Sequence, residues 1–157
     1  MHAFNYPGGA FVSGSATIPA GGRLVLHRGV ILKLKSTAEL LALGGGLDLL
    51  GTAVEPVVVT SLADDELGGD TPGDGPTGGL PGSWRRVHWS GGATSTAEHA
   101  LLRFGGASGH PAFDCQAAGA SLRSVRAEHA AGDGLRASAH SGPAVNWTAF
   151  DLSLIHI

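Results

Sequence analysis

Five acidic side chains lie close together in residues 62–83, a stretch that contains no lysine or arginine. Seven glycines and three prolines share the same 22 positions. Calcium takes six to eight oxygen ligands, and carboxylates on a flexible, glycine-rich turn can supply them. Residues 70–75, Asp-Thr-Pro-Gly-Asp-Gly, have acids at positions one and five and glycine at position six of an EF-hand-type loop, but Pro72 and Pro81 occupy positions three and twelve. We therefore consider two alternatives, a solvated acidic turn and a calcium site whose ligands would be Asp64, Asp65, Asp70 and Asp74.

The three residues that follow the acidic stretch could bind a sugar. The indole of Trp84 offers a flat face for stacking on a sugar ring, and the guanidinium groups of Arg85 and Arg86 suit the carboxylate of an acidic sugar. The alternative for Trp84 is a buried indole whose N–H is hydrogen-bonded inside the protein. The sequence thus predicts a carbohydrate-binding site at Trp84, Arg85 and Arg86.

The composition narrows the class of protein that must position these residues. The 157-residue chain is 43% hydrophobic and contains 26 glycines, and only 15% of it is charged, against about 25% in an average soluble domain. This composition predicts one globular domain that turns often and packs small residues. The net charge of −3 argues against nucleic acid as a partner, and no apolar run is long enough to span a membrane. The single cysteine, Cys115, excludes an internal disulfide framework.

Apolar residues recur about every 23 positions along the chain, and this repeat predicts the fold. At an offset of 23, Ile18 aligns with Leu41, Leu24 with Leu47 and Leu26 with Leu49. The later units are Ala97, Ala100 and Leu102, then Leu122, Val125 and Ala127, then Val145, Thr148 and Phe150. Apolar residues alternate over short runs that end at glycine or proline, which favours strands over helices.

A repeat of this length fits one turn of a parallel coil, with stacked turns about 4.8 Å apart. We therefore predict an all-β fold, a right-handed parallel β-helix of about five coils, with a β-sandwich as the alternative. Seven residues should point inward and stack in columns: Ile18, Leu24, Leu41, Leu47, Leu102, Val125 and Ala127. Residues 62–83 then form an excursion from one corner of this solenoid.

Several segments resemble a known family. "ATIPAGGRLVLHRGVILKL", "GTAVEPVVVTSLADD", "GGDTPGDG", "AEHALLRFGG" and "LRSVRAEHAAGDGL" are similar to the right-handed parallel β-helix repeat proteins of the pectate-lyase-like superfamily, in particular large secreted or surface-displayed bacterial proteins. The resemblance implies an extracellular or cell-surface location, and polysaccharide or a cell-surface glycan as partner. It implies no single activity, because this fold carries lyases, hydrolases, adhesins and inert stalks.

The remaining charged residues predict stacking rather than catalysis. In the repeat alignment Glu98 falls over Arg123 and Glu128 over Arg103, as outward charge pairs on adjacent coils. No three carboxylates converge in this register, and the eight histidines lack the spacing of a zinc site. We therefore predict a non-catalytic module, a stalk or adhesion and carbohydrate-binding scaffold of a larger exported protein that supplies further coils. The alternative is a fragment of a polysaccharide lyase or glycoside hydrolase whose catalytic coils lie outside this chain.

The repeat also predicts the organisation of the chain. Residues 1–10 should be a lead-in and residues 11–151 the β-helix domain with its excursion at 62–83. The last six residues, Leu-Ser-Leu-Ile-His-Ile, are what the bases CTG TCT CTT ATA CAC ATC encode, and these bases match a transposase end used in preparing sequencing libraries. We therefore expect residues 152–157 to be non-native adapter sequence that does not belong to the fold.

Overall fold

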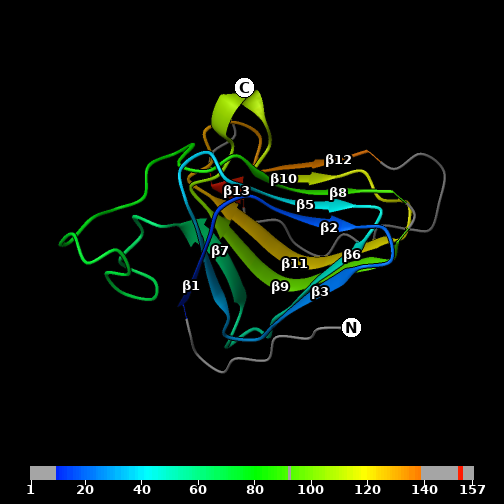
Figure 1. The fold of residues 1–157 in the computed structure, drawn as a ribbon, viewed down its shortest axis with the longest axis horizontal. Helices are drawn as coiled ribbons and strands as arrows, with labels where there is room; N and C mark the ends of the chain where they lie inside the picture. Colours follow the sequence, from blue (N-terminus) through cyan, green and yellow to red (C-terminus); the bar gives the residue numbers. More distant parts are fainter. Residues whose placement is uncertain (1–9, 92, 139–151, 154–157) are drawn as a thin grey trace.

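Parallel strands wind into a β-solenoid of about five turns, as the repeat predicts (Figure 1). The computed structural model describes residues 10–91, 93–138 and 152–153. Every strand pair between coils is parallel, so each coil hydrogen-bonds to the coil before and after it. The repeat therefore predicted the fold class correctly.

The coils build two sheets. The five-stranded sheet contains β2 (Ala16–Pro19), β5 (Glu39–Leu43), β8 (Arg86–Ser90), β10 (Phe113–Cys115) and β12 (Leu135–Ala137). The eight-stranded sheet contains β1 (Ala10–Ser13), β3 (Arg23–His27), β4 (Ile31–Leu34), β6 (Gly46–Leu50), β7 (Val57–Ser61), β9 (Ser95–Arg103), β11 (Ala120–Glu128) and β13 (Leu152–Ser153). A short 3₁₀ turn, η1 (Ala107–Gly109), lies between β9 and β10.

The eight-stranded sheet bends within its two longest strands. The first part of β9 pairs with β6 and its second part pairs with β7, so one continuous strand covers two faces of the coil. The bend falls at His99, with φ of 47°, and Ser124 stands at the same place in β11 with φ of 52°. Left-handed backbone at matching positions of two stacked coils turns the chain without breaking the ladder.

The inward columns confirm most of the predicted register. Leu24 pairs with Leu47 and Leu26 with Leu49, and the later units pair Ala97 with Leu122, Ala100 with Val125 and Leu102 with Ala127. Leu47, Leu49 and Leu102 are fully buried. The third unit, Val145, Thr148 and Phe150, lies outside the described residues.

The predicted position of Leu41 is wrong. Ile18 pairs with Ala42, and the buried residues of β5 are Leu40 and Ala42. The offset between β2 and β5 is one residue longer than between β3 and β6, where Leu24 meets Leu47. Because side chains alternate along a strand, a shift of one residue turns Leu41 to the outer face.

Two of the last six residues belong to the described structure. Leu152 and Ser153 form β13, which pairs with Ala127 and Glu128 of β11. The other four lie outside the described residues, so the adapter origin of this segment stays a prediction.

The acidic stretch leaves the solenoid between β7 and β8 as a long loop that projects to the left of the view (Figure 1). We call residues 62–83 the excursion. It begins directly after β7, and its last residues run beside the corner that precedes β5, where the Thr37 amide donates to the Ser83 carbonyl at 3.2 Å. Both ends of the excursion are therefore fixed to the stacked coils.

Truncating Leu47 to alanine should lower the free energy of unfolding by about 2–5 kcal/mol, because it opens a cavity in a fully buried column. Leu43→Ala is the matched control, since Leu43 is 44% exposed on the outer face of β5 and its loss should cost about 0.5 kcal/mol or less. Urea denaturation of both variants measures the difference. Equal losses would contradict the inward and outward assignment.

Candidate functional site

Arg103 of β9 fixes the first residues of the excursion to the solenoid wall. Its Nη1 lies 3.0 Å from Oδ2 of Asp64 and its Nη2 lies 2.7 Å from Oε2 of Glu66. Asp64 is fully buried and also accepts a hydrogen bond from the Thr60 hydroxyl at 2.5 Å. Glu128, stacked on Arg103 as predicted, lies 3.5 Å from Nε. A buried carboxylate is thus matched to a buried guanidinium.

Lys33 of β4 provides a second buried anchor. Its Nζ donates to the Gly69 carbonyl at 2.5 Å and lies 4.0 Å from Oδ1 of Asp65. The other oxygen of Asp65 accepts from the amide and the hydroxyl of Thr77, at 2.6 and 3.0 Å. Lys33 is completely buried, so the excursion covers its ammonium group. Asp65 therefore joins the first part of the excursion, which leaves β7, to the later part that contains Thr77 and returns to β8; we call these the outgoing and returning limbs.

The returning limb also packs against the wall. A Cβ atom added at Gly79 would meet the ring of Phe104 at 2.2 Å, so glycine is required for this close approach. Phe104 in turn stacks on His129 of the next coil, with ring centroids 5.2 Å apart. The guanidinium carbon of Arg103 lies 4.9 Å from the centroid of the Phe104 ring. Both limbs of the excursion therefore meet the same part of the solenoid.

The structure does not bring the four predicted calcium ligands together. Asp64 and Asp65 lie in the contacts described above, and Asp70 accepts hydrogen bonds from the backbone amides of Gly73, Asp74 and Gly75. Among the described residues no group of three or more His, Cys, Asp or Glu side chains could hold a metal ion. Calcium binding stays a prediction, and it would require these carboxylates to leave their present partners.

Trp84 cannot form the predicted sugar-stacking platform. It is fully buried, and its indole N–H donates to the Arg103 carbonyl at 2.7 Å. This is the alternative that the sequence left open, and its cause is the place of Trp84 at the end of the excursion, where it anchors the returning chain in the core. Arg85 and Arg86 remain partly exposed, at 34% and 21% of their side chains.

These two arginines belong to a row of polar side chains on the outer face of the five-stranded sheet. Glu39 of β5 accepts from Arg85 at 3.1 Å and from Arg86 at 3.3 Å. Asp114 of β10 accepts from Arg86 Nη1 at 3.1 Å, and the Nδ1 atom of His88 lies at the same distance from it. We call Glu39, Arg85, Arg86, His88, Asp114 and Gln116 the polar row.

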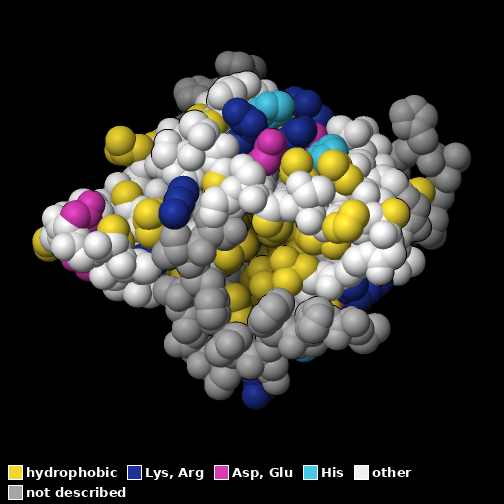
Figure 2. Space-filling model, in the orientation of Figure 1, with side chains coloured by type: hydrophobic (Ala, Val, Ile, Leu, Met, Phe, Trp, Pro, Cys, Tyr) yellow, Lys and Arg dark blue, Asp and Glu magenta, His cyan; other side chains and the backbone are white. Residues whose placement is uncertain are grey.

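Asp114 is the centre of this row. It is almost fully buried, and the side-chain amide of Gln116 donates to its two oxygens at 3.2 and 3.3 Å. Figure 2 shows basic, acidic and histidine side chains gathered along one edge of the molecule, over β10 and β12 of Figure 1. Three successive coils therefore hold one hydrogen-bonded set of charged and polar groups.

The polar row was missed in the sequence because its members are far apart along the chain. Arg86 and His88 alternate with buried Val87 and Trp89, which marks them as outward residues of one strand. Their partner Asp114 follows only after β9 and η1. Val87 pairs with Phe113, and this register places Asp114 beside His88. Because the corners between strands differ in length, no constant spacing in the sequence reveals this register.

The chemistry available in the row is proton transfer and hydrogen bonding. Asp114 contacts Nδ1 of His88, an arrangement that orients an imidazole and can leave its other nitrogen to a ligand. Cys115 beside it points into the core, and burial raises the pKa of its thiol, which disfavours the reactive thiolate. The thiol therefore lies on the buried side of β10, away from the outward polar row.

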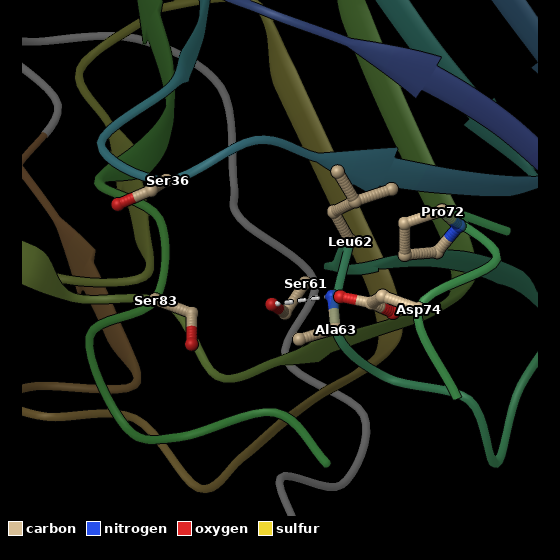
Figure 3. Close-up of a pocket in the computed structure, with 7 residues that line it drawn as sticks. All are labelled: Ser36, Ser61, Leu62, Ala63, Pro72, Asp74 and Ser83. Carbon is tan, nitrogen blue, oxygen red and sulfur yellow. Dashed lines mark hydrogen bonds between the residues drawn. The ribbon is translucent and has the colours of Figure 1, made fainter. Parts of the chain in front are cut away.

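A pocket of about 270 Å³ lies where the excursion meets the corner before β5. Its walls are formed by Ser36, Ser61, Leu62, Ala63, Pro72, Asp74 and Ser83. Figure 3 shows Ser36 and Ser83 on one side, Leu62, Pro72 and Asp74 on the other, and Ser61 between them. Ser83 is two residues before Arg85, so the pocket lies close to the start of the polar row.

Comparison with known proteins gives no match to a protein family, a curated protein or a solved structure. In the described part of the chain no helix is long and apolar enough to cross a membrane. The candidate sites are therefore defined by their geometry alone.

Replacing Arg103 by methionine should lower the free energy of unfolding by about 3–5 kcal/mol, because it leaves the buried Asp64 carboxylate without its cation. The control is Arg123→Met, which removes an exposed pair with Glu98 at 3.9 Å and should cost about 0–1 kcal/mol. Chemical denaturation measures both. A loss no larger than that of the control would show that Asp64 does not depend on Arg103.

Acid should loosen the excursion through Glu66. The hydrogen bond from Arg103, and then its charge, lower the pKa of the Glu66 carboxyl below the ordinary value of 4.5. This contact therefore stabilises the attached excursion above pH 4.5 and is lost as the pH falls through the lowered pKa. We expect proteolytic cleavage of residues 62–83 to accelerate over that range.

The same cleavage measured on Glu66→Gln should show a weaker dependence on pH. Glu55→Gln, at an exposed pair with Arg28 on another corner, corrects for the effect of pH on the protease. If Glu66→Gln and Glu55→Gln give the same pH profile, Glu66 does not control the excursion.

Proposed function

We propose that this chain is a non-catalytic glycan-binding module of a larger exported or surface protein, and that its polar row binds the acidic sugar units of a polysaccharide. The observation that carries the proposal is the sharing of the Glu39 carboxylate by two guanidinium groups. Arg85 and Arg86 are held in place by Glu39 and keep part of their surface exposed. Donors fixed in this way lose little conformational entropy when a carboxylate binds.

The rest of the outer face suits a sugar chain. Leu41 and Leu43 of β5 point outward and pair with His88 and Ser90 of β8, so an apolar strip lies beside the polar row. A saccharide presents hydroxyl groups at its edges and C–H groups on its ring faces, and sites that combine a few polar groups with an apolar surface match both. The stacked coils supply both kinds of surface side by side.

The second candidate function is that of a polysaccharide lyase or glycoside hydrolase fragment, and the contact between His88 and Asp114 favours it. A carboxylate at Nδ1 can hold an imidazole ready to accept a proton from a bound sugar. The same polysaccharides used for binding serve as the assay, since cleavage would release shorter products. Turnover that disappears in Asp114→Asn would support the enzyme over the binding module.

Replacing Arg85 by glutamine should weaken the binding of polygalacturonate by about tenfold, because it removes one charged hydrogen-bond donor from the row. Isothermal titration calorimetry of the whole chain measures the affinity. Binding should also fall as salt is added, since the ligand is a polyanion.

The matched control is Arg123→Gln, which removes an exposed arginine from the eight-stranded sheet and should leave the affinity unchanged. Dextran, a neutral polysaccharide, should show no dependence on Arg85. Equal effects of the two substitutions would place the acidic ligand away from the polar row, and absence of any polygalacturonate binding would contradict the proposal.

A further inference from the structure

The pocket beside the polar row is built from parts of the chain that only the folded excursion brings together. Ser36 comes from the corner before β5, and Ser61 ends β7. Pro72 and Asp74 come from the middle of the excursion, and Ser83 from its end. The pocket therefore exists because the excursion folds back onto the solenoid wall.

Two polar groups in this pocket are available to a ligand. The Asp74 carboxylate and the Ser36 hydroxyl have no hydrogen-bond or ion-pair partner in the described part of the chain. The other two hydroxyls already have partners: Ser61 accepts from the Ala63 amide at 3.2 Å, and Ser83 donates to the Leu80 carbonyl at 2.7 Å. A bound molecule would thus meet one carboxylate and one hydroxyl without a competing protein partner.

The remaining lining residues are apolar. They are Leu62, Ala63 and Pro72, labelled in Figure 3. A divalent cation is a poor fit, because it requires several oxygen ligands and the pocket offers a single carboxylate beside three apolar side chains. An anion is also a poor fit, because Asp74 would repel it. A neutral molecule with both hydroxyl groups and an apolar face satisfies the whole wall.

We propose that this pocket binds one neutral sugar ring of the glycan whose acidic units lie on the polar row. Asp74 accepts hydrogen bonds from two neighbouring hydroxyls of the ring, and the C–H face of the ring packs against Leu62 and Pro72. Ser36 supplies a further hydrogen bond. The inference rests on the proposed function and adds to it that the ligand contains neutral as well as acidic units.

Lys33 controls the pocket from a distance. It does not line the space, but its ammonium group holds the excursion through Gly69 and lies beside Asp65. Loss of this anchor removes Pro72 and Asp74 from their places opposite Ser36. Lys33→Met should therefore weaken sugar binding although Lys33 does not contact the ligand.

The test is ligand-observed NMR of the whole chain with the methyl pyranosides of glucose, galactose and mannose. We expect saturation transfer to at least one of them, and a loss of affinity of about tenfold or more in Asp74→Asn, which removes a charged acceptor. Ser36→Leu should block the same ligand by filling the pocket. Asp133→Asn, at an exposed carboxylate paired with Arg136, is the matched control and should bind as the wild type does.

The outcomes separate this inference from the proposed function. If none of the three sugars binds the wild type, or if Asp74→Asn and Ser36→Leu bind them unchanged, the pocket proposal is overturned, whatever polygalacturonate does. If the sugars bind in an Asp74-dependent way and polygalacturonate does not bind, the polar row is wrong and the pocket stands. Circular dichroism of each variant tests whether the solenoid is intact, so that a loss of binding can be assigned to the pocket itself.

Discussion

The buried contact between Arg103 and Asp64 is the interaction on which the candidate binding surface depends. A carboxylate that is fully removed from water is costly to keep charged unless a cation and further hydrogen bonds surround it. Arg103 and the Thr60 hydroxyl meet this requirement, and both belong to the stacked coils. The excursion therefore attaches where its acids reach these partners. The position of the pocket and the start of the polar row follow from that attachment.

The parallel ladder explains why the outer face can carry a polar row. Alternate residues of each strand in the five-stranded sheet point into the core. In β8, Val87 and Trp89 are buried in the core, and Arg86 and His88 face outward. Stacking then places Asp114 of the next coil beside His88, at the spacing of neighbouring strands. The same strand register therefore determines both the buried core and the outward polar row. A one-residue slip would bury the charged groups and expose Val87 and Trp89, and the cost of that exchange specifies the register strongly.

Part of this structure was predictable from the sequence because the apolar pattern of a whole strand repeats in the next coil. The column of Leu24 with Leu47 follows from a spacing of 23 residues, and the column of Leu102 with Ala127 follows from a spacing of 25, as do the outward pairs of Arg123 with Glu98 and Arg103 with Glu128. Where the pattern does not fix the alignment of two strands, the prediction fails. One additional residue before β5 turns Leu41 outward, and the long path through β9 and η1 conceals the meeting of His88 with Asp114. For Trp84 the sequence left two alternatives open, a sugar-stacking indole and a buried one, and in the structure the indole anchors the end of the excursion in the core.

The acidic residues of the excursion have different roles near its base and farther out. Near its base, Asp64 and Glu66 lie against Arg103, and Asp65 lies near Lys33, so the solenoid's own cations balance the charges that a bound metal would otherwise balance. Farther out, Asp70 holds a turn through three backbone amides. Asp74 alone keeps a carboxylate without a partner among the described residues, and it faces the pocket. Acids at the base therefore fold the loop, and the acid that folding leaves unpaired is the one that we propose as a ligand contact.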